Sequence, residues 1–245
     1  MRLDESQESS FGHRATHGRT ALLLLGGFEL VSNGESIPLS SGAQRVLAFL
    51  ALQDRPLGRP YVAGTLWQGT TDKRASGSLR SALWNLRLSG YELVEARNGC
   101  LQLASDLFVD YRRAVAMARS VFNRSRPFPA DILEGRFFHV DLLCDWYDEW
   151  VLVERERFRQ FRLHVLEALC EGLTVEGEFA YAIEAGLSAV IGEPLRESAR
   201  RVLIQAYLAE GNRQEALRQY DAYRTLLREE LDTLPSPKLQ ALVGF

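Results

Sequence analysis

The chain has 245 residues, of which 46% are hydrophobic and 25% charged, so it can form one large or two ordinary globular domains. This composition excludes general disorder, and no apolar run is long enough to predict a transmembrane helix. The net charge of −3 gives no general affinity for nucleic acid. The cysteines Cys100, Cys144 and Cys170 are odd in number and lack CxxC spacing, which predicts no disulfide framework and a cytoplasmic location.

The charge is nevertheless unevenly distributed along the chain. Residues 1–110 carry 11 basic and 11 acidic side chains, whereas residues 111–245 carry 18 and 21. Within residues 72–88 the basic side chains are Lys73, Arg74, Arg80 and Arg87, and the acidic one is Asp72. This local basic patch predicts modest, salt-sensitive binding to nucleic acid despite the negative total.

From the N-terminus, a polar leader precedes the first predicted strands. Residues 1–19 are rich in Ser, Glu, His and Arg, which predicts a disordered leader. Apolar runs follow, and Gly26-Gly27 and Asn33-Gly34 interrupt them. Asn-Gly favours a type I′ turn because both central residues of that turn need a positive φ. We therefore expect short strands joined by a tight turn.

Three helices and a second hairpin are predicted next. Apolar residues at helical spacing predict a helix at 41–53, and Pro60 suits the first turn of a helix at about 60–68. A third helix is predicted at 73–88, which Thr71 or Asp72 can cap. Its buried stripe consists of Ala75, Leu79, Ala82, Leu83 and Leu86. Two strands around Arg97-Asn98-Gly99 complete the element order of an OmpR-type winged helix.

The pattern becomes purely helical from Asp110 onward, with prolines at the breaks. The predicted helices span 110–123, 141–172, 177–191, 195–210, 212–230 and 237–243. We therefore predict a mainly α protein. It consists of a disordered leader (1–19), a winged helix-turn-helix domain of α+β type (20–109) and an all-α, TPR-like (tetratricopeptide) domain (110–245).

A 34-residue internal period supports the TPR-like prediction. Glu176-Gly177 and Glu210-Gly211 lie 34 residues apart, and Ala182 matches Ala216 at the same offset. Glycine allows a tight turn between paired helices, and a small alanine allows close packing. Chance similarity between two helical hairpins is the alternative. A repeat of this kind predicts a protein-binding or dimerising surface.

The helix at 73–88 is the candidate DNA-reading element, because a recognition helix needs one buried face and one polar face. If Leu79 lies at the middle of the buried stripe, the opposite face and its flanks hold Arg74, Ser78, Arg80, Ser81, Trp84, Asn85 and Arg87. Arginine can donate two hydrogen bonds to guanine, and asparagine can form two with adenine. The alternative is an ordinary amphipathic helix with a solvated arginine face.

Further residues extend this candidate site. Ser76 and Ser78 lie near the helix start, where hydroxyl and backbone N–H groups can bind phosphate. Arg97 lies at the predicted hairpin tip and suits a wing that reaches a phosphate or the minor groove. An exposed Trp84 would suggest a contact with DNA, although Trp84 can equally pack on Trp67 or Leu66.

Three segments carry a resemblance to a known family. They are Gln44-Arg45 in the first helix, Leu66-Trp67 in the second, and Ser78-Leu79-Arg80 with Leu86-Arg87 in the third. With them, nearly the whole chain after residue 20 resembles the SARP (AfsR-like) family of actinobacterial activators. Residues from about 110 to 243 resemble that family's bacterial transcriptional activator domain. At Leu88-Ser89-Gly90 the chain departs from many relatives, which carry more basic residues there. We therefore expect it to bind DNA phosphates more weakly.

The resemblance implies a transcriptional activator of secondary-metabolite (antibiotic biosynthesis) genes. Such proteins bind direct repeats in double-stranded DNA near the −35 element as side-by-side pairs, so we expect a homodimer on DNA. They recruit the RNA polymerase holoenzyme, and the loop implied to contact it consists of Gln68, Gly69, Thr70, Thr71, Asp72 and Lys73. Activation rather than repression rests on the resemblance alone. The ATPase domain of larger relatives is not expected, because no Walker A string occurs.

An enzyme is not expected, nor are a catalytic residue, a cofactor, a metal or a membrane partner. No nucleophile elbow, HExxH motif or P-loop occurs, and His139 and His164 are expected to be structural. The carboxylates Asp141, Asp145, Asp148 and Glu149 share helical spacing and are predicted to form a solvated face.

Two rival functions remain. One is a TPR-like adaptor with weak or lost DNA binding. The other is a ligand-responsive regulator whose pocket would be lined by Phe137, Phe138, Trp146, Tyr147 and Trp150, although such a cluster is more often core.

Overall fold

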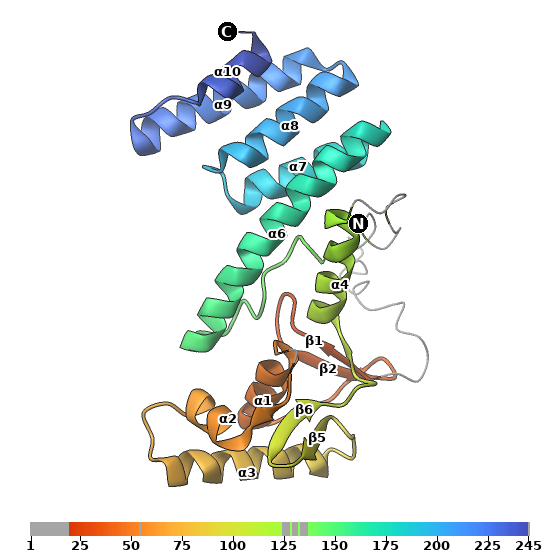
Figure 1. Ribbon diagram of the computed structural model, residues 1–245, viewed down its shortest axis with the longest axis vertical. Helices are drawn as coiled ribbons and strands as arrows, with labels where there is room; N and C mark the ends of the chain where they lie inside the picture. The colour runs from red at the N-terminus through yellow and green to blue at the C-terminus, as the bar shows by residue number, and fades with distance from the viewer. Residues whose placement is uncertain (1–19, 54, 124–127, 129–131, 133–136, 245) are drawn as a thin grey trace, which may run out of the picture. The chain divides into compact units, whose positions relative to one another are not determined.

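The computed structural model describes residues 20–53, 55–123, 128, 132 and 137–244, so the predicted leader at 1–19 lies outside the described residues. The chain divides into two compact units (Figure 1). Unit 1 contains the residues up to Ala114 together with Leu142–Glu154, and unit 2 contains Val115–Asp141 and the residues from Arg155 onward. The predicted domain bounds, 20–109 and 110–245, stay predictions.

Unit 1 begins with a small sheet whose strand order is β3-β2-β1-β7. Its strands are β1 (Ala21–Leu23), β2 (Glu29–Ser32), β3 (Glu35–Ser36) and β7 (Phe108–Val109). Strand β1 pairs antiparallel with β2 and parallel with β7. Asn33 and Gly34 have φ values of 52° and 83°, so both adopt the positive φ that a type I′ turn needs.

Three helices and a hairpin follow, which confirms the winged helix-turn-helix prediction (Figure 1). The helices are α1 (Ser41–Ala51), α2 (Arg59–Leu66) and α3 (Asp72–Leu88). A second sheet has the order β4-β6-β5 and consists of β4 (Leu57–Gly58), β5 (Val94–Arg97) and β6 (Cys100–Leu103). Asn98 and Gly99 have φ values of 51° and 77° at the β5–β6 turn, as the sequence predicts.

Two polar side chains at the start of α4 (Asp110–Phe122) tie distant parts of unit 1 together. Buried Asp110 accepts the backbone N–H groups of Leu24 at 2.9 Å and Leu25 at 3.0 Å. Burial raises the pKa of the Asp110 carboxyl, although these backbone hydrogen bonds oppose the rise. The Arg112 guanidinium donates to three carbonyl oxygens around the C-terminal end of α1. Arg112 thereby supplies donors to carbonyls at the helix end, where no further helical turn follows, and the Leu50 carbonyl also accepts the backbone N–H of Gln53.

The helix predicted at 141–172 begins later, because α6 spans Glu149–Glu176. Leu142 forms a β-bridge with Leu25, and the Leu143 N–H donates to the carbonyl of Leu24 at 2.8 Å. Trp146 then stacks on Phe28 with ring centroids 5.8 Å apart. This pairing with the first strand region overrides the helical spacing. The predicted helical face of Asp141, Asp145, Asp148 and Glu149 is therefore wrong.

Unit 2 stacks helical hairpins built from α7 (Phe179–Gly192), α8 (Glu197–Glu210) and α9 (Arg213–Leu231). Gly177 and Gly211, 34 residues apart, have φ values of 79° and 90° and make the turns between helices. Gly186 faces Leu203 and Cys170 so closely that an added Cβ would lie 3.0 Å from a Leu203 methyl carbon. The TPR-like prediction is confirmed: α8 packs against both neighbours in sequence.

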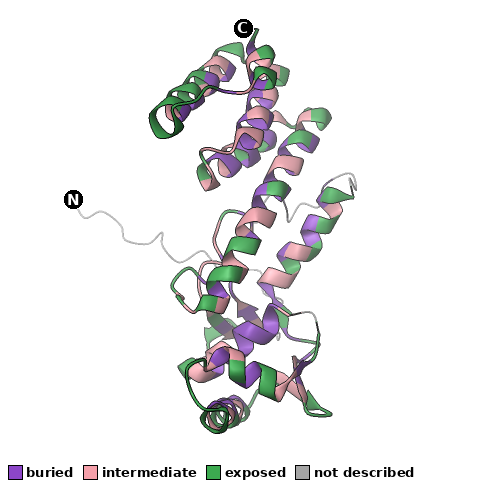
Figure 2. Cartoon of the chain, turned by 60° about the vertical axis from the view of Figure 1, so that its left-hand side comes forward, coloured by how far each residue is buried: buried purple, intermediate pink, exposed green. Residues whose placement is uncertain are grey.

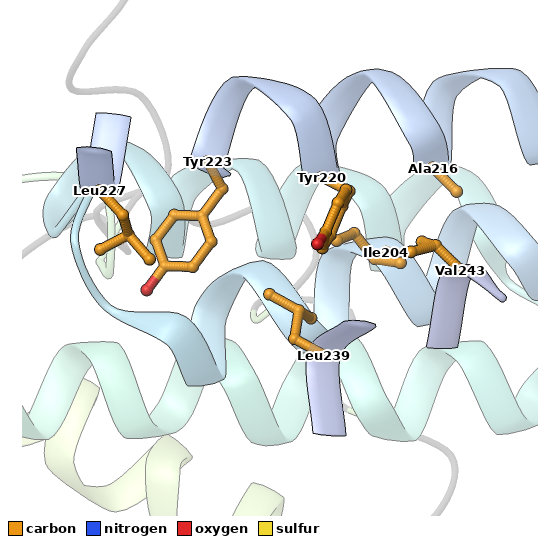
Figure 3. Packing of buried hydrophobic residues seen from close by; sticks show 7 residues of the cluster. All are labelled: Ile204, Ala216, Tyr220, Tyr223, Leu227, Leu239 and Val243. Carbon is orange, nitrogen blue, oxygen red and sulfur yellow. The ribbon is translucent and has the colours of Figure 1, made fainter. Parts of the chain in front are cut away.

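The last helix, α10 (Pro237–Val243), closes the C-terminal end of unit 2. Leu239 and Val243 of α10 pack on Ile204 of α8 and on α9, as Figure 3 shows. Within each unit the buried residues gather on the inner sides of the helices, and the outer sides are exposed (Figure 2). In the described part of the chain, no helix combines the length and apolarity needed to cross a membrane.

Candidate nucleic-acid interface

Helix α3 separates a buried stripe from a polar face. Thr71 caps its N-terminus, because the Thr71 hydroxyl accepts the backbone N–H of Arg74 at 3.4 Å. The buried stripe consists of Ala75, Leu79, Ala82 and Leu86, and Leu83 is only half-buried. Contacts with α1 and α2 hold this stripe in unit 1. The apolar periodicity therefore fixes which side of α3 remains available to a partner.

The opposite side of α3 is exposed and cationic. The exposed residues are Arg74, Arg80, Ser81, Trp84, Asn85 and Arg87, and Ser76 and Ser78 are half-buried. Trp84 is 60% exposed, so it lies open on this face rather than packed beneath a neighbour. Asp72 at the helix start is the acidic residue of α3. Arginines surrounding an exposed indole suit a polyanion whose bases also present apolar groups.

Gly77 lies next to the Arg80 guanidinium. A Cβ built at Gly77 would lie 3.8 Å from Nη2 of Arg80, in ordinary van der Waals contact. The guanidinium thus lies back along the helix toward its N-terminal turn. Glycine has no side chain beyond its Cα, which allows a partner to approach the helix backbone closely at this point.

Asn85 contacts a residue outside α3. Its side-chain amide donates to the Ser40 hydroxyl at 3.2 Å. Ser40 occupies the N-cap position of α1, yet its hydroxyl makes no capping hydrogen bond there. Together with Ser78, Ser81 and Arg45, these residues line a groove of about 340 Å³ beside α3. Arg45 also forms an ion pair with Asp148.

The β5–β6 hairpin lies beside the C-terminal half of α3 and contributes Arg97 to a second group of arginines (Figure 1). The Arg97 side chain is 80% exposed near the hairpin tip and lies 3.3 Å from Glu95. Arg59, at the start of α2, lines a hollow of about 660 Å³ together with Arg87 and Arg97. The backbone N–H of Arg59 donates to the carbonyl of Gly99, which joins α2 to the hairpin turn.

The structure thus brings the predicted residues onto one helix face and a neighbouring hairpin. Arg74 lies at the opposite end of α3 from the Arg87 and Arg97 group, so the cations are spread along the helix. The predicted polymerase-contact loop lies between α2 and the second turn of α3, and its residues, 68–73, are all exposed.

Sequence reasoning did not single out Arg59, Ser40 or Arg45 as site residues. Arg59 adds a cation to the hollow, and Ser40 fixes the Asn85 amide. A basic residue placed directly before Pro60 at a helix start was the available signal for Arg59. No local signal links Ser40 to Asn85, because 45 residues separate them.

Residues 135–244 match the family model of the bacterial transcriptional activator domain. The regulatory protein AfsR of Streptomyces coelicolor is 28% identical over 242 residues, which cover 89% of this chain and 23% of AfsR. The chain is related to the SARP (AfsR-like) transcriptional regulators. The resemblance drawn from the sequence is thereby confirmed.

EmbR, a second transcriptional regulator, is similar to this chain in sequence and in structure. The transcriptional regulatory protein EmbR of Mycobacterium tuberculosis is 28% identical over 250 residues, which cover 89% of this chain and 61% of EmbR. The solved structure of Mycobacterium tuberculosis EmbR in complex with a low affinity phosphopeptide matches 92% of this chain with a TM-score of 0.70. At 23% sequence identity that match shows the fold. The chain spans less than a quarter of AfsR and 61% of EmbR.

Proposed function

We propose that this chain is a sequence-specific DNA-binding transcription regulator in which α3 enters the major groove and the β5–β6 hairpin is the wing. The observation that carries the proposal is the exposed face of α3, where arginines flank Trp84 and Asn85 opposite a buried leucine stripe. The relatives AfsR and EmbR bear the names of regulatory proteins, which supports the same function.

In this proposal the residues divide into two roles. Arg80, Asn85 and Arg87 read base edges, because they project from the exposed face of a helix that fits the major groove. Arg59 and Arg97 contact phosphates near the hairpin, together with the Ser76 hydroxyl near the helix start. Base contacts determine sequence preference, whereas phosphate contacts determine position and salt dependence.

The proposal extends to activation at promoters. The chain binds direct repeats near the −35 element as a homodimer, and the exposed loop at 68–73 contacts RNA polymerase. The regulated genes belong to a secondary-metabolite cluster. Support for these finer points comes from the relationship with SARP regulators and from the exposure of the loop.

A mobility-shift titration with selected promoter fragments over a salt series tests DNA binding. Each of Arg80→Ala and Arg87→Ala should weaken specific binding by about 1–3 kcal/mol, roughly 5- to 150-fold, if it removes a bidentate base contact. Arg97→Ala should instead lower affinity for all sequences and reduce the salt slope by about 0.9. Arg228→Ala, an exposed arginine of α9 in unit 2, is the matched control and should bind as the unmodified chain does.

The loop is tested separately by transcription in vitro from the selected promoter. A variant with Gln68→Ala and Thr70→Ala should bind DNA normally but stimulate transcription less, since both side chains are exposed. Equal stimulation by this variant and the unmodified chain would contradict the polymerase contact while leaving DNA binding intact.

A protein-binding adaptor is the second candidate, and the stacked hairpins of unit 2 favour it. The same mobility-shift titration separates the two functions. Absent binding, or binding that neither salt nor the α3 substitutions change, supports the adaptor. Selective, salt-dependent binding that Arg80→Ala and Arg87→Ala each weaken supports the regulator.

A further inference from the structure

The outward-facing side chains of α3 change from small to large and apolar toward its C-terminal end. A helix advances about 100° per residue, so the residues about 140–200° around α3 from buried Leu79 are Gly77, Ser81, Trp84 and Leu88. Trp84 is 60% exposed and Leu88 is 66% exposed. These two side chains lie one helical turn apart and form an apolar strip on the outside of α3.

Arginines border the apolar strip. Arg80 and Arg87 lie about one helical turn on either side of Trp84, and both are exposed. Asp72, the acidic residue of α3, lies at the other end of the helix. Exposed apolar side chains that are rimmed by polar ones mark an interaction surface. A surface with this charge complements a polyanion that also presents apolar groups, as duplex DNA does in its major groove.

The chemistry of the indole limits what Trp84 can recognise in that groove. An indole has one donor, Nε1–H, and no acceptor, so it cannot form the two hydrogen bonds by which arginine or asparagine selects a base. The apolar group that base edges present in the major groove is the C5-methyl group of thymine. An indole placed against another base removes polar atoms from water without replacing most of their hydrogen bonds, which costs affinity.

We propose that Trp84 selects a thymine in the bound site by packing its indole on the C5-methyl group, an inference that rests on the DNA-binding function proposed above. The sizes of the outward-facing side chains support it. Gly77 and Ser81 allow the N-terminal half of α3 to approach the bases, which is the half that recognition helices commonly place against base edges. Farther along the helix a longer side chain is needed to reach a base, and Trp84 provides it.

Removal of single methyl groups from the DNA tests the proposal. Binding sites for the full-length chain are first selected in vitro, and each thymine is then replaced in turn by deoxyuridine, which lacks the C5-methyl group but keeps the base-pairing atoms. At the thymine that Trp84 contacts, a mobility-shift titration should show about a fourfold loss of affinity, because a buried methyl group contributes roughly 0.8 kcal/mol.

Variants assign that loss to the indole. Trp84→Ala should bind the selected site more weakly, and deoxyuridine at the contacted position should then cause no further loss. Trp84→Phe keeps an apolar ring and should retain part of the methyl dependence. Tyr147→Ala is the matched control, since Tyr147 is an 80% exposed aromatic residue of unit 1 outside α3, and it should show the full fourfold loss. All of these chains should share one salt dependence, because an indole neutralises no phosphate.

Fluorescence provides a second measurement on the same complex. The selected duplex should change the tryptophan emission of the unmodified chain, because the exposed indole of Trp84 loses contact with water on binding. Trp84→Phe should remove most of this change, since Trp67, Trp146 and Trp150 remain in both chains.

The outcomes separate this inference from the proposed function. A methyl-dependent loss that Trp84→Ala removes supports the thymine contact. Selective DNA binding overturns that contact but not the DNA-binding function if the selected sites prefer no thymine, if no deoxyuridine weakens binding, or if Trp84→Ala retains the loss. Absence of selective DNA binding by the unmodified chain overturns both.

Discussion

Arg112 provides the sharpest test of how unit 1 is held together. Its guanidinium donates to the carbonyl oxygens of Leu50 at 3.1 Å, Ala51 at 3.0 Å and Gln53 at 2.9 Å. These carbonyls lie at the end of α1, the helix whose buried face supports α3. Arg112→Met keeps most of the aliphatic part of the side chain and removes all three hydrogen bonds.

The size of the effect follows from these contacts. A hydrogen bond from a charged donor contributes about 1.5–3 kcal/mol, and three such bonds share one guanidinium here. Fixing an arginine side chain costs up to about 2 kcal/mol, which offsets part of the gain. We therefore expect Arg112→Met to lower the free energy of unfolding of unit 1 by about 2–4 kcal/mol.

Tryptophan fluorescence during urea unfolding measures this loss selectively. All four tryptophans, Trp67, Trp84, Trp146 and Trp150, belong to unit 1, so their emission follows that unit. With a denaturant slope of about 1–3 kcal/mol per molar, the midpoint should fall by roughly 1–2 M urea. Circular dichroism reports unit 2 as well and should show a second, unchanged transition if the units unfold separately.

Arg55→Met is the control, because Arg55 is an exposed arginine of the same unit. Its fluorescence midpoint should remain close to that of the unmodified chain. An equal shift for Arg55→Met and Arg112→Met would refute the reasoning, since it would mean that the three carbonyl contacts contribute nothing to the stability of unit 1.

Further predictions concern single buried positions. Burial raises the pKa of the Cys170 thiol to about 12, so at pH 8 only about one thiol in ten thousand is ionised, and a thiol reagent should modify exposed Cys144 while Cys170 reacts only after denaturation. Gly186→Ala should lower the stability of unit 2 by about 1–3 kcal/mol, because the new Cβ would lie 3.0 Å from Leu203; an unchanged melting temperature by circular dichroism would contradict this. Asp110→Asn should cost unit 1 about 1–3 kcal/mol, because the amide retains only one acceptor oxygen, whereas the two carboxylate oxygens accept the backbone N–H groups of Leu24, Leu25 and Tyr111. Burial raises the pKa of Asp110 in the folded chain above its ordinary value of 3.8, so protonated Asp110 stabilises the fold at low pH. This stabilisation is lost as the pH rises through the folded-state pKa. Urea midpoints should therefore separate the Asp110→Asn variant from the unmodified chain more at pH 4 than at pH 7, and the opposite trend would contradict the assignment.

The elements that the sequence predicts well are those whose cause is local. Asn33-Gly34 and Asn98-Gly99 form turns because each pair adopts positive φ at little cost. The third helix begins at Asp72, one residue before the predicted start, since Thr71 supplies the cap. Gly177 and Gly211 end helices for the same backbone reason, so the 34-residue period could be recognised without knowledge of the packing.

The errors arise where a distant segment decides the local structure. Leu142 and Leu143 were predicted as helical from their spacing, but Leu25 and Leu24 provide backbone partners about 118 residues away. Leu143 even adopts a positive φ of 46° to make this contact. Helical periodicity cannot reveal such a competition, because the competing hydrogen bonds come from residues far away in the sequence.

The candidate site shows the same division between local and distant causes. Which residues of α3 face outward follows from the 3.6-residue period around Leu79, and the sequence was sufficient for that. The contact between Ser40 and Asn85 depends on how α1 packs against α3, so the sequence alone could not supply it.

That contact also bears on how a base would be read. A serine at an N-cap commonly accepts a backbone N–H of its own helix, whereas the Ser40 hydroxyl accepts the Asn85 amide. One amide hydrogen of Asn85 is thereby engaged, and the other remains available together with the amide oxygen, as bidentate pairing with adenine requires. If Asn85 reads a base as proposed, its selectivity is set partly by a residue of α1 that itself needs no contact with DNA.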